Sequence, residues 1–208
     1  PNILSKAKAR LLMDHPFFAT LLLTTPIVIT EDVELAATDG RNIYINPHFL
    51  DHLSVEDTMT VLAHEVGHDS LLHSLRLGAR NHDLWNQACD HAINLMLEEQ
   101  GFTCPASVPG GWLCDHQYKG WSAEKIYDDL VKQSQNQPQN GKGSKRDWLH
   151  GDLKPVSGHQ DPAQQAETVR KMKQKVAEAA TRARMAGRLK GELARMVDEF
   201  LDPKVPWP

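Results

Sequence analysis

Two histidines and a glutamate occur together in the sequence HEVGH, which covers residues 64–68. Residues four apart lie on the same face of an α-helix, so His64 and His68 can point at one metal ion. Imidazole nitrogen suits Zn²⁺, which commonly takes about four ligands. Glu65 directly follows the first histidine, where it would lie beside the ion and could accept a proton from water that the ion activates. The pattern predicts a zinc site with Glu65 as general base.

The HEVGH pattern needs support from its surroundings, because the chain contains 11 histidines. An HExxH string arises by chance in about a few per cent of such chains. The alternative is that His64 and His68 are ordinary polar positions of an amphipathic helix. The surroundings favour a metal site, since the pattern lies in the middle of a predicted helix and follows strand-like segments.

A catalytic zinc site usually has three protein ligands and water, so a third ligand is needed. The candidates downstream of the motif are His73, His82, Asp83, Asp90, His91 and Glu98. Asp90 is preferred because it lies in the apolar run WNQACDHAINLML, where a buried carboxylate is costly unless a metal compensates it. Asn94, four residues on, shares its face and could orient the carboxylate or an imidazole ligand. His91 and Glu98 remain as alternatives.

The motif helix is expected to begin after Ser54, whose pairing with an acidic residue three positions on is typical of a capping box. Apolar residues recur at helical spacing as far as Leu77, and Gly78 offers a C-terminal stop. His73 lies five residues after His68, so a continuous helix rotates it away from the ligand face.

A second helix is expected from Leu84 to about Gln100, with Asp83 as its N-cap and Gly101 at its end. It carries the preferred third ligand. Ser122 is expected to cap a shorter helix with the sequence SAEKIYDDL.

The region before the motif helix is expected to form a helix and a small sheet. Residues 3–23 have apolar positions at helical spacing, interrupted by Pro16. Two strand-like runs flank Asp39-Gly40, which is typical of a hairpin turn. We therefore expect a largely antiparallel sheet.

Composition and charge exclude several function classes. The formal net charge of −4 provides no long-range attraction to nucleic acid or to anionic membranes. No stretch is long and apolar enough to span a bilayer. The cysteines, Cys89, Cys104 and Cys114, form no CxxC pair, so we expect reduced thiols. These features predict a cytoplasmic protein with no nucleic-acid or membrane partner.

The order of the motifs resembles a family of predicted metal-dependent peptidases from bacteria and phages. Members of that family carry a zincin-like N-terminal domain and a von Willebrand factor A-like C-terminal domain. The segments that carry the resemblance are PFFATLL, TDGRNIYINPHFL, VLAHEVGH, the following LxHxxR, WNQACDHAIN, GWSAEKIYDDL and LDPKVPW. They cover almost the whole chain. Because the chain stops at Pro208, we expect an N-terminal piece of a longer protein or a shortened phage version.

The resemblance implies that His64, His68 and Asp90 are the metal ligands and that Glu65 is the general base. His73 and Arg76 also match family positions, although chemistry assigns them no role; an ion pair of Arg76 with Asp69 or Asp83 is one reading. Many zincins use a further His, Tyr or Arg to hold the oxyanion. The candidates here are Arg76, His116 and Tyr118.

The predicted fold class is α+β and zincin-like, with a small, mostly antiparallel sheet packed on the HExxH helix and additional C-terminal helices. Residues 1–131 would form the metallopeptidase core, and residues 132–146 a flexible polar loop. Residues 147–208 would form a helical part of the same domain, with helices over 162–187 and 189–201.

The predicted function is zinc-dependent hydrolysis of peptide bonds in a protein or peptide substrate. A von Willebrand A-like domain or partner protein is the expected partner. The alternative is a catalytically silent, zinc-bearing binding or regulatory module, which would have no need of Glu65. A zinc deaminase is disfavoured, because its H-x-E…P-C-x-x-C arrangement is absent from the sequence.

Overall fold

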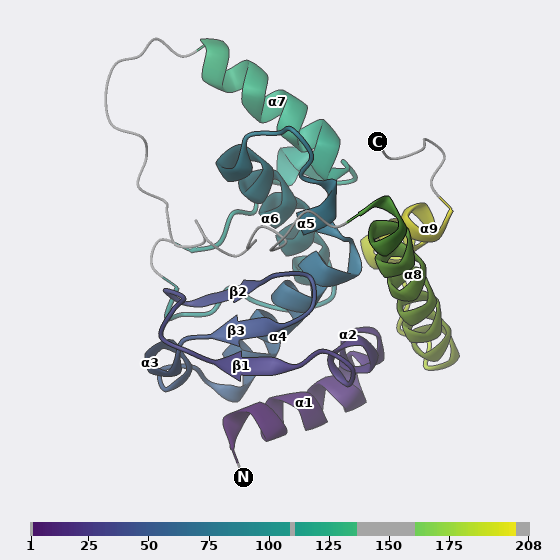
Figure 1. Cartoon of the computed structure of the whole chain (residues 1–208). Coiled ribbons are helices and arrows are strands. Elements are labelled where there is room, and N and C mark those ends of the chain that lie inside the picture. The colour runs from purple at the N-terminus through teal and green to yellow at the C-terminus, as the bar shows by residue number, and fades with distance from the viewer. Residues whose placement is uncertain (1, 109–110, 137–160, 203–208) are drawn as a thin grey trace.

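A three-stranded sheet and the helix packed against it form the centre of the fold (Figure 1). The computed structural model describes residues 2–108, 111–136 and 161–202. The strands are β1 (Ile27–Ile29), β2 (Ala36–Thr38) and β3 (Ile43–Ile45), arranged in the order β1-β3-β2. The helix is α4 (Val55–Ser70), which contacts β2 and β3.

The sheet is mixed, and this differs from the mostly antiparallel sheet that we predicted. The expected hairpin at Asp39-Gly40 is present: Gly40 has a φ of 83°, and β2 pairs antiparallel with β3. However, β1 pairs with β3 in parallel, with Ile27 opposite Ile43. The chain places β2 at the far edge of the sheet. The second strand of the hairpin, β3, therefore lies between β2 and β1.

The N-terminal helical region is broken where the sequence predicts. Helix α1 (Ile3–Asp14) ends before His15, and α2 (Pro16–Leu22) begins with the proline at its first position. Proline is tolerated there because the first N–H groups of a helix have no partner within it. Both helices pack on α4, and α2 also contacts α8 (Pro162–Met185).

Helix α4 begins as predicted but ends earlier. The side chains of Ser54 and Asp57 form both hydrogen bonds of a capping box. The helix stops at Ser70, not near Leu77, because Leu72 adopts a left-handed conformation with a φ of 54°. A short helix, α5 (His73–Arg76), follows in a new direction.

Side chains from other elements stabilise this break. Trp85 donates a hydrogen bond of 2.9 Å from Nε1 to the carbonyl of His73. Arg76 donates one of 2.9 Å to the carbonyl of Leu71. Leu72 itself is buried in the main core. Tertiary packing and these two bonds therefore outweigh the helical periodicity of the sequence.

The second long helix, α6 (His82–Glu99), carries the preferred third ligand and packs on α4. Its N-cap is Asn81, whose side chain accepts a 3.0 Å bond from Leu84 N, so the prediction of Asp83 as the cap is wrong. Helix α7 packs along α6 and covers Ala123–Asn136. The first residues of the predicted loop at 132–146 are therefore helical, and 137–146 lie outside the described residues.

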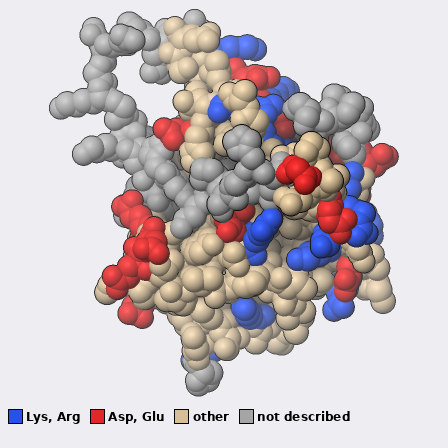
Figure 2. Space-filling view, viewed as in Figure 1, with Lys and Arg blue, Asp and Glu red and all other residues tan. Residues whose placement is uncertain are grey.

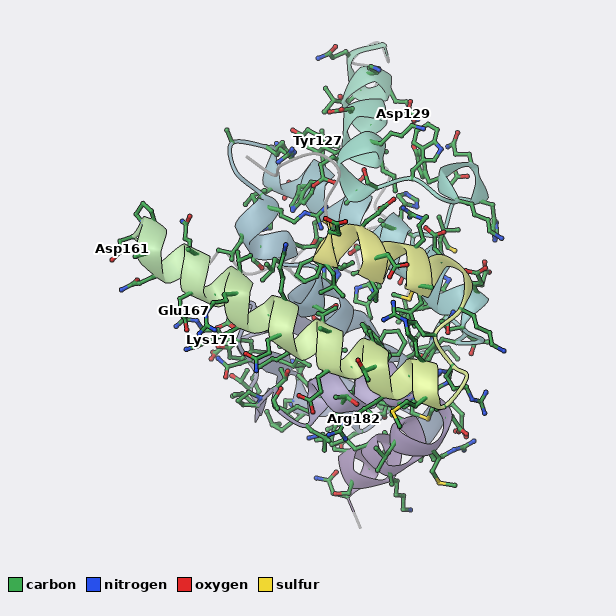
Figure 3. The ribbon with its side chains drawn as sticks, turned by 90° about the vertical axis from the view of Figure 1, so that its right-hand side faces the viewer. Tyr127, Asp129, Asp161, Glu167, Lys171 and Arg182 are labelled. Carbon is green, nitrogen blue, oxygen red and sulfur yellow. The ribbon has the colours of Figure 1, made fainter. Side chains whose placement is uncertain are left out.

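The C-terminal helices flank this centre. Helix α8 begins at its N-cap Asp161, which accepts bonds from Ala163 N and Gln164 N (Figure 3). It packs on α2, and α9 (Gly191–Leu201) packs on α8 and α6. Figure 2 shows acidic and basic side chains intermingled over this side of the molecule. The remaining elements are α3 (Pro47–Leu50) and the 3-10 helix η1 (His116–Tyr118). Among the described residues, no helix has the length and apolar character needed to cross a bilayer.

Candidate metal centre

Three side chains converge between α4 and α6. The Nε2 atoms of His64 and His68 lie 2.9 Å apart. Oδ1 of Asp90 lies 3.2 Å from Nε2 of His68 and 3.7 Å from Nε2 of His64. All three residues are buried. Two imidazoles from one helix and a carboxylate from the next thus face a common point, as a metal site requires.

Gly67 lies at the contact between α4 and α6. A Cβ atom at this position would lie 3.4 Å from Cδ1 and Cγ2 of Ile93 on α6. Ile93 is fully buried, and it follows Asp90 by about one turn of helix. The two helices are therefore in contact about one turn from Asp90, which places its carboxylate close to the two histidines.

The second nitrogen of each histidine has a partner outside the cluster. Nδ1 of His64 lies 2.9 Å from Oδ1 of Asn94, whose Nδ2 donates a 3.0 Å bond to the carbonyl of Leu113. Nδ1 of His68 lies 3.2 Å from Nδ1 of His73. If each Nδ1 of His64 and His68 carries the proton, both Nε2 atoms keep a free lone pair. Such outer contacts fix the tautomer and orientation of metal-binding imidazoles.

Burial keeps these imidazoles neutral. Desolvation lowers the pKa of His64 to about 4 and the pKa of His68 to about 3. Only the neutral imidazole can bind a metal through its lone pair. The donor set of two nitrogens and one carboxylate oxygen fits zinc, which binds such ligands with a further position left for water.

Glu65 lies beside this cluster without joining it. Its side chain is buried, and its Oε2 has no hydrogen-bond partner among the described residues. Desolvation raises the pKa of Glu65 well above its ordinary 4.5, and the charges of Asp69 and Asp90 act in the same direction. A carboxylate in this environment binds a proton readily, which is what a general base must do.

A small cleft lies beside His64 and Glu65. Its other lining residues are mainly apolar and come from α3, α4, the start of β2 with the residue before it, and the loop after α6: Leu35, Ala36, Phe49, Thr60, Val61, Pro105 and Trp112. Sequence analysis missed these residues as site residues. The sequence feature that points to them is the high content of Pro and Trp in the loop after α6, where Pro105 and Trp112 form part of the cleft wall.

The profile of a family described as "Putative metallopeptidase domain" matches residues 1–208. The chain belongs to this family. Comparison with curated proteins and with solved structures gave no significant match. The family description agrees with the peptidase family that the sequence resembles, and the His-His-Asp cluster is a candidate for the metal that the family implies.

Several other residues that the sequence offered as the third metal ligand of this metallopeptidase domain lie outside the His64 and His68 cluster. His82 and Asp83 lie at the start of α6 and contact each other. His91 accepts a 3.2 Å bond at Nδ1 from the backbone of Asp115. Glu98 lies beside His116, with 2.6 Å between its Oε2 and the imidazole Nε2. Of the six downstream candidates, only Asp90 belongs to the His64 and His68 cluster.

Two of the three oxyanion candidates, Arg76 and Tyr118, are bonded to side chains of α7. Arg76 donates to both carboxylate oxygens of Glu124, at 2.6 and 2.7 Å, and not to Asp69 or Asp83 as the sequence had suggested. The hydroxyl of Tyr118 donates a 3.0 Å bond to Asp129, which is labelled on α7 in Figure 3. These contacts give both side chains a structural role.

Proposed function

We propose that this protein is a zinc-dependent peptidase in which His64, His68 and Asp90 hold the ion and Glu65 is the general base. The observation that carries the proposal is that the three donors converge and that Glu65, whose carboxyl group interacts with that of Asp90, lines the same cleft as His64. We further propose that α4 and the adjoining sheet correspond to the active-site helix and sheet of a zincin.

Zinc bound by these residues would supply a Lewis acid that acidifies water and polarises a carbonyl group. The role of Glu65 follows from its surroundings. Its free Oε2 is available to accept the proton of the attacking water, and its raised pKa favours keeping that proton until the amine leaves. A bound cation opposes this rise in pKa, because its charge favours the ionised carboxylate. The two effects act in opposite directions on the pKa of Glu65, and their balance sets its basicity.

The cleft supports a preference for apolar substrates. Phe49, Val61 and Trp112 present apolar surface within the same cleft as Glu65. Burying an apolar substrate side chain there contributes about 25 cal/mol for each Å² removed from water. We therefore propose that the preferred peptides carry an apolar residue next to the bond that is cleaved.

The test is hydrolysis of a mixed peptide library by the zinc-loaded protein, with the products sequenced by mass spectrometry. Glu65→Gln keeps the size of the side chain and removes the base, so we expect at least a ~100-fold loss of cleavage with zinc content unchanged. The matched control is Glu56→Gln, because Glu56 is an exposed glutamate on the same helix that pairs with Arg10. Its activity should equal that of the wild type.

Two results would overturn the proposal. The first is equal cleavage by the wild type and Glu65→Gln. The second is zinc bound at this site with no cleavage of any library member, which would favour a zinc-bearing binding module. A product set without apolar residues at the cleaved bond would overturn only the proposed preference.

A further inference from the structure

A second group of potential metal ligands lies near the C-terminal end of α6, about two turns of helix beyond Asp90. It comprises Glu98 on α6, Cys114 on the loop that follows and His116 at the start of η1. Oε2 of Glu98 lies 2.6 Å from Nε2 of His116 and accepts a contact of 3.8 Å from the thiol of Cys114. The three donor atoms all lie within 4.8 Å of one another. A sulfur, a nitrogen and an oxygen thus converge from two segments of the chain.

The backbone around these ligands is held in place on α6. Asn94 Nδ2 donates to the carbonyl of Leu113, and the N–H of Asp115 donates to His91 Nδ1. His91, Asn94 and Glu98 share one face of the helix, because they are three, four and seven residues apart. The residues on either side of Cys114 are therefore fixed, and the direction of its side chain toward Glu98 follows from the fold.

We propose that Glu98, Cys114 and His116 form a second zinc site on the surface of the protein. The mixed donor set suits zinc, whereas calcium and magnesium prefer oxygen ligands alone. The site is reachable, since 69% of the His116 side chain and 46% of the Glu98 side chain are exposed. Binding displaces the thiol proton of Cys114 to solvent, and water completes the coordination.

The second site would stabilise the wall of the cleft. Cys114 lies two residues after Trp112, which lines the cleft with Pro105 of the same loop. The adjacent Leu113 accepts the bond from Asn94 that in turn orients His64. An ion that fixes Cys114 to α6 therefore fixes both the cleft wall and the contact that holds one ligand of the first site.

Cobalt binding distinguishes the two sites, because only the second contains sulfur. Cobalt titrated into the metal-free full chain should produce thiolate-to-cobalt charge-transfer absorption whose final intensity corresponds to one cobalt–thiolate bond per chain. Cys114→Ser should abolish this band, and His116→Ala should weaken the cobalt affinity at least ~10-fold. The matched control is Cys104→Ser, since Cys104 lies in the same loop but belongs to neither group of converging donors. It should retain the band.

Zinc stoichiometry provides an independent readout. We expect two equivalents in the wild type and one in both Cys114→Ser and Asp90→Ala. If the first site binds no zinc, the wild type and Asp90→Ala will each hold one equivalent and Cys114→Ser none, and the second site still stands. Absence of the charge-transfer band in the wild type, or its persistence in Cys114→Ser, would overturn the second site whatever the first one does.

Discussion

The imidazoles of His68 and His73 meet with 3.2 Å between their Nδ1 atoms, although five residues separate them along the chain. In a continuous helix the two side chains would point about 140° apart. The break after Ser70 and the left-handed conformation of Leu72 turn His73 back toward the site. Burial lowers the pKa of His73 well below 6.5, so it is neutral and can accept the Nδ1 proton of His68.

We expect His73→Ala to weaken zinc binding at the first site by about 10–100-fold, the range found when an outer partner of a metal ligand is lost. His73→Asn keeps a hydrogen-bond acceptor close to the position of Nδ1 and should recover part of the affinity. Competition with a chelator of known affinity measures the effect, on a Cys114→Ser background that removes the second site. Equal affinities for the alanine variant and its parent would show that His73 does not orient His68.

The left-handed backbone conformation of Leu72 reverses the order of stability expected for glycine and alanine variants at this position. Leu72→Gly and Leu72→Ala both remove a buried side chain, at a cost of about 2–5 kcal/mol. Alanine keeps a Cβ atom in the left-handed conformation, which costs about 1–2 kcal/mol that glycine avoids. We therefore expect the glycine variant to be more stable by about 1 kcal/mol in urea unfolding. In a regular helix the order would be the reverse, by about 1 kcal/mol. An alanine variant that equals or exceeds the glycine variant would contradict the break.

The start of α4 could be predicted from the sequence, but its end at Ser70 could not. Local signals predicted the start of α4 at Ser54 and the hairpin at Asp39-Gly40, because capping and turn chemistry depend on residues a few positions apart. The end of α4 depends on Trp85, which lies on another helix and bonds to the carbonyl of His73. No local pattern contains that contact.

The same distinction applies to the candidate site. The spacing of His64 and His68 is a property of one helix and could be read directly. Asp90 could be chosen because a carboxylate in an apolar run needs compensation, and the structure places its Oδ1 3.2 Å from His68. The cluster of Glu98 with the loop after α6 could not be predicted, because it depends on the path of an irregular segment.

Asp90→Ala should greatly reduce the gain in stability that the protein shows when zinc is added. A ligand at about 1,000 times its dissociation constant stabilises the folded state by about 4 kcal/mol. The wild type should gain this amount at the first site when zinc is added, and Asp90→Ala should gain far less. Thermal unfolding with and without zinc, again on the Cys114→Ser background, measures the difference. Asp83→Ala is the control, because Asp83 is an exposed carboxylate on the same helix. A full zinc response in Asp90→Ala would remove Asp90 from the ligand set.

The ion pair between Arg76 and Glu124 predicts a pH dependence of stability. Partial burial raises the pKa of Glu124, but the charge and hydrogen bonds of Arg76 outweigh it and hold the pKa below the ordinary 4.5. A carboxylate whose pKa is lowered by folding stabilises the folded state at pH values above its unfolded pKa. That contribution is lost as the pH falls below about 4.5 and through the lower folded pKa.

Glu124→Gln should therefore be less stable than the wild type by about 1–2 kcal/mol at neutral pH, since the pair is only partly shielded from water. The difference should shrink as the pH falls below about 4.5, because the wild-type carboxyl group becomes protonated and resembles the amide. Urea unfolding of both proteins across this pH range measures it, and Glu178→Gln, which removes an exposed pair with Arg182, should show almost no difference at either pH. A Glu124→Gln deficit that stays constant from neutral to acid pH would mean that the glutamate acts through packing against α5 and not through its charge.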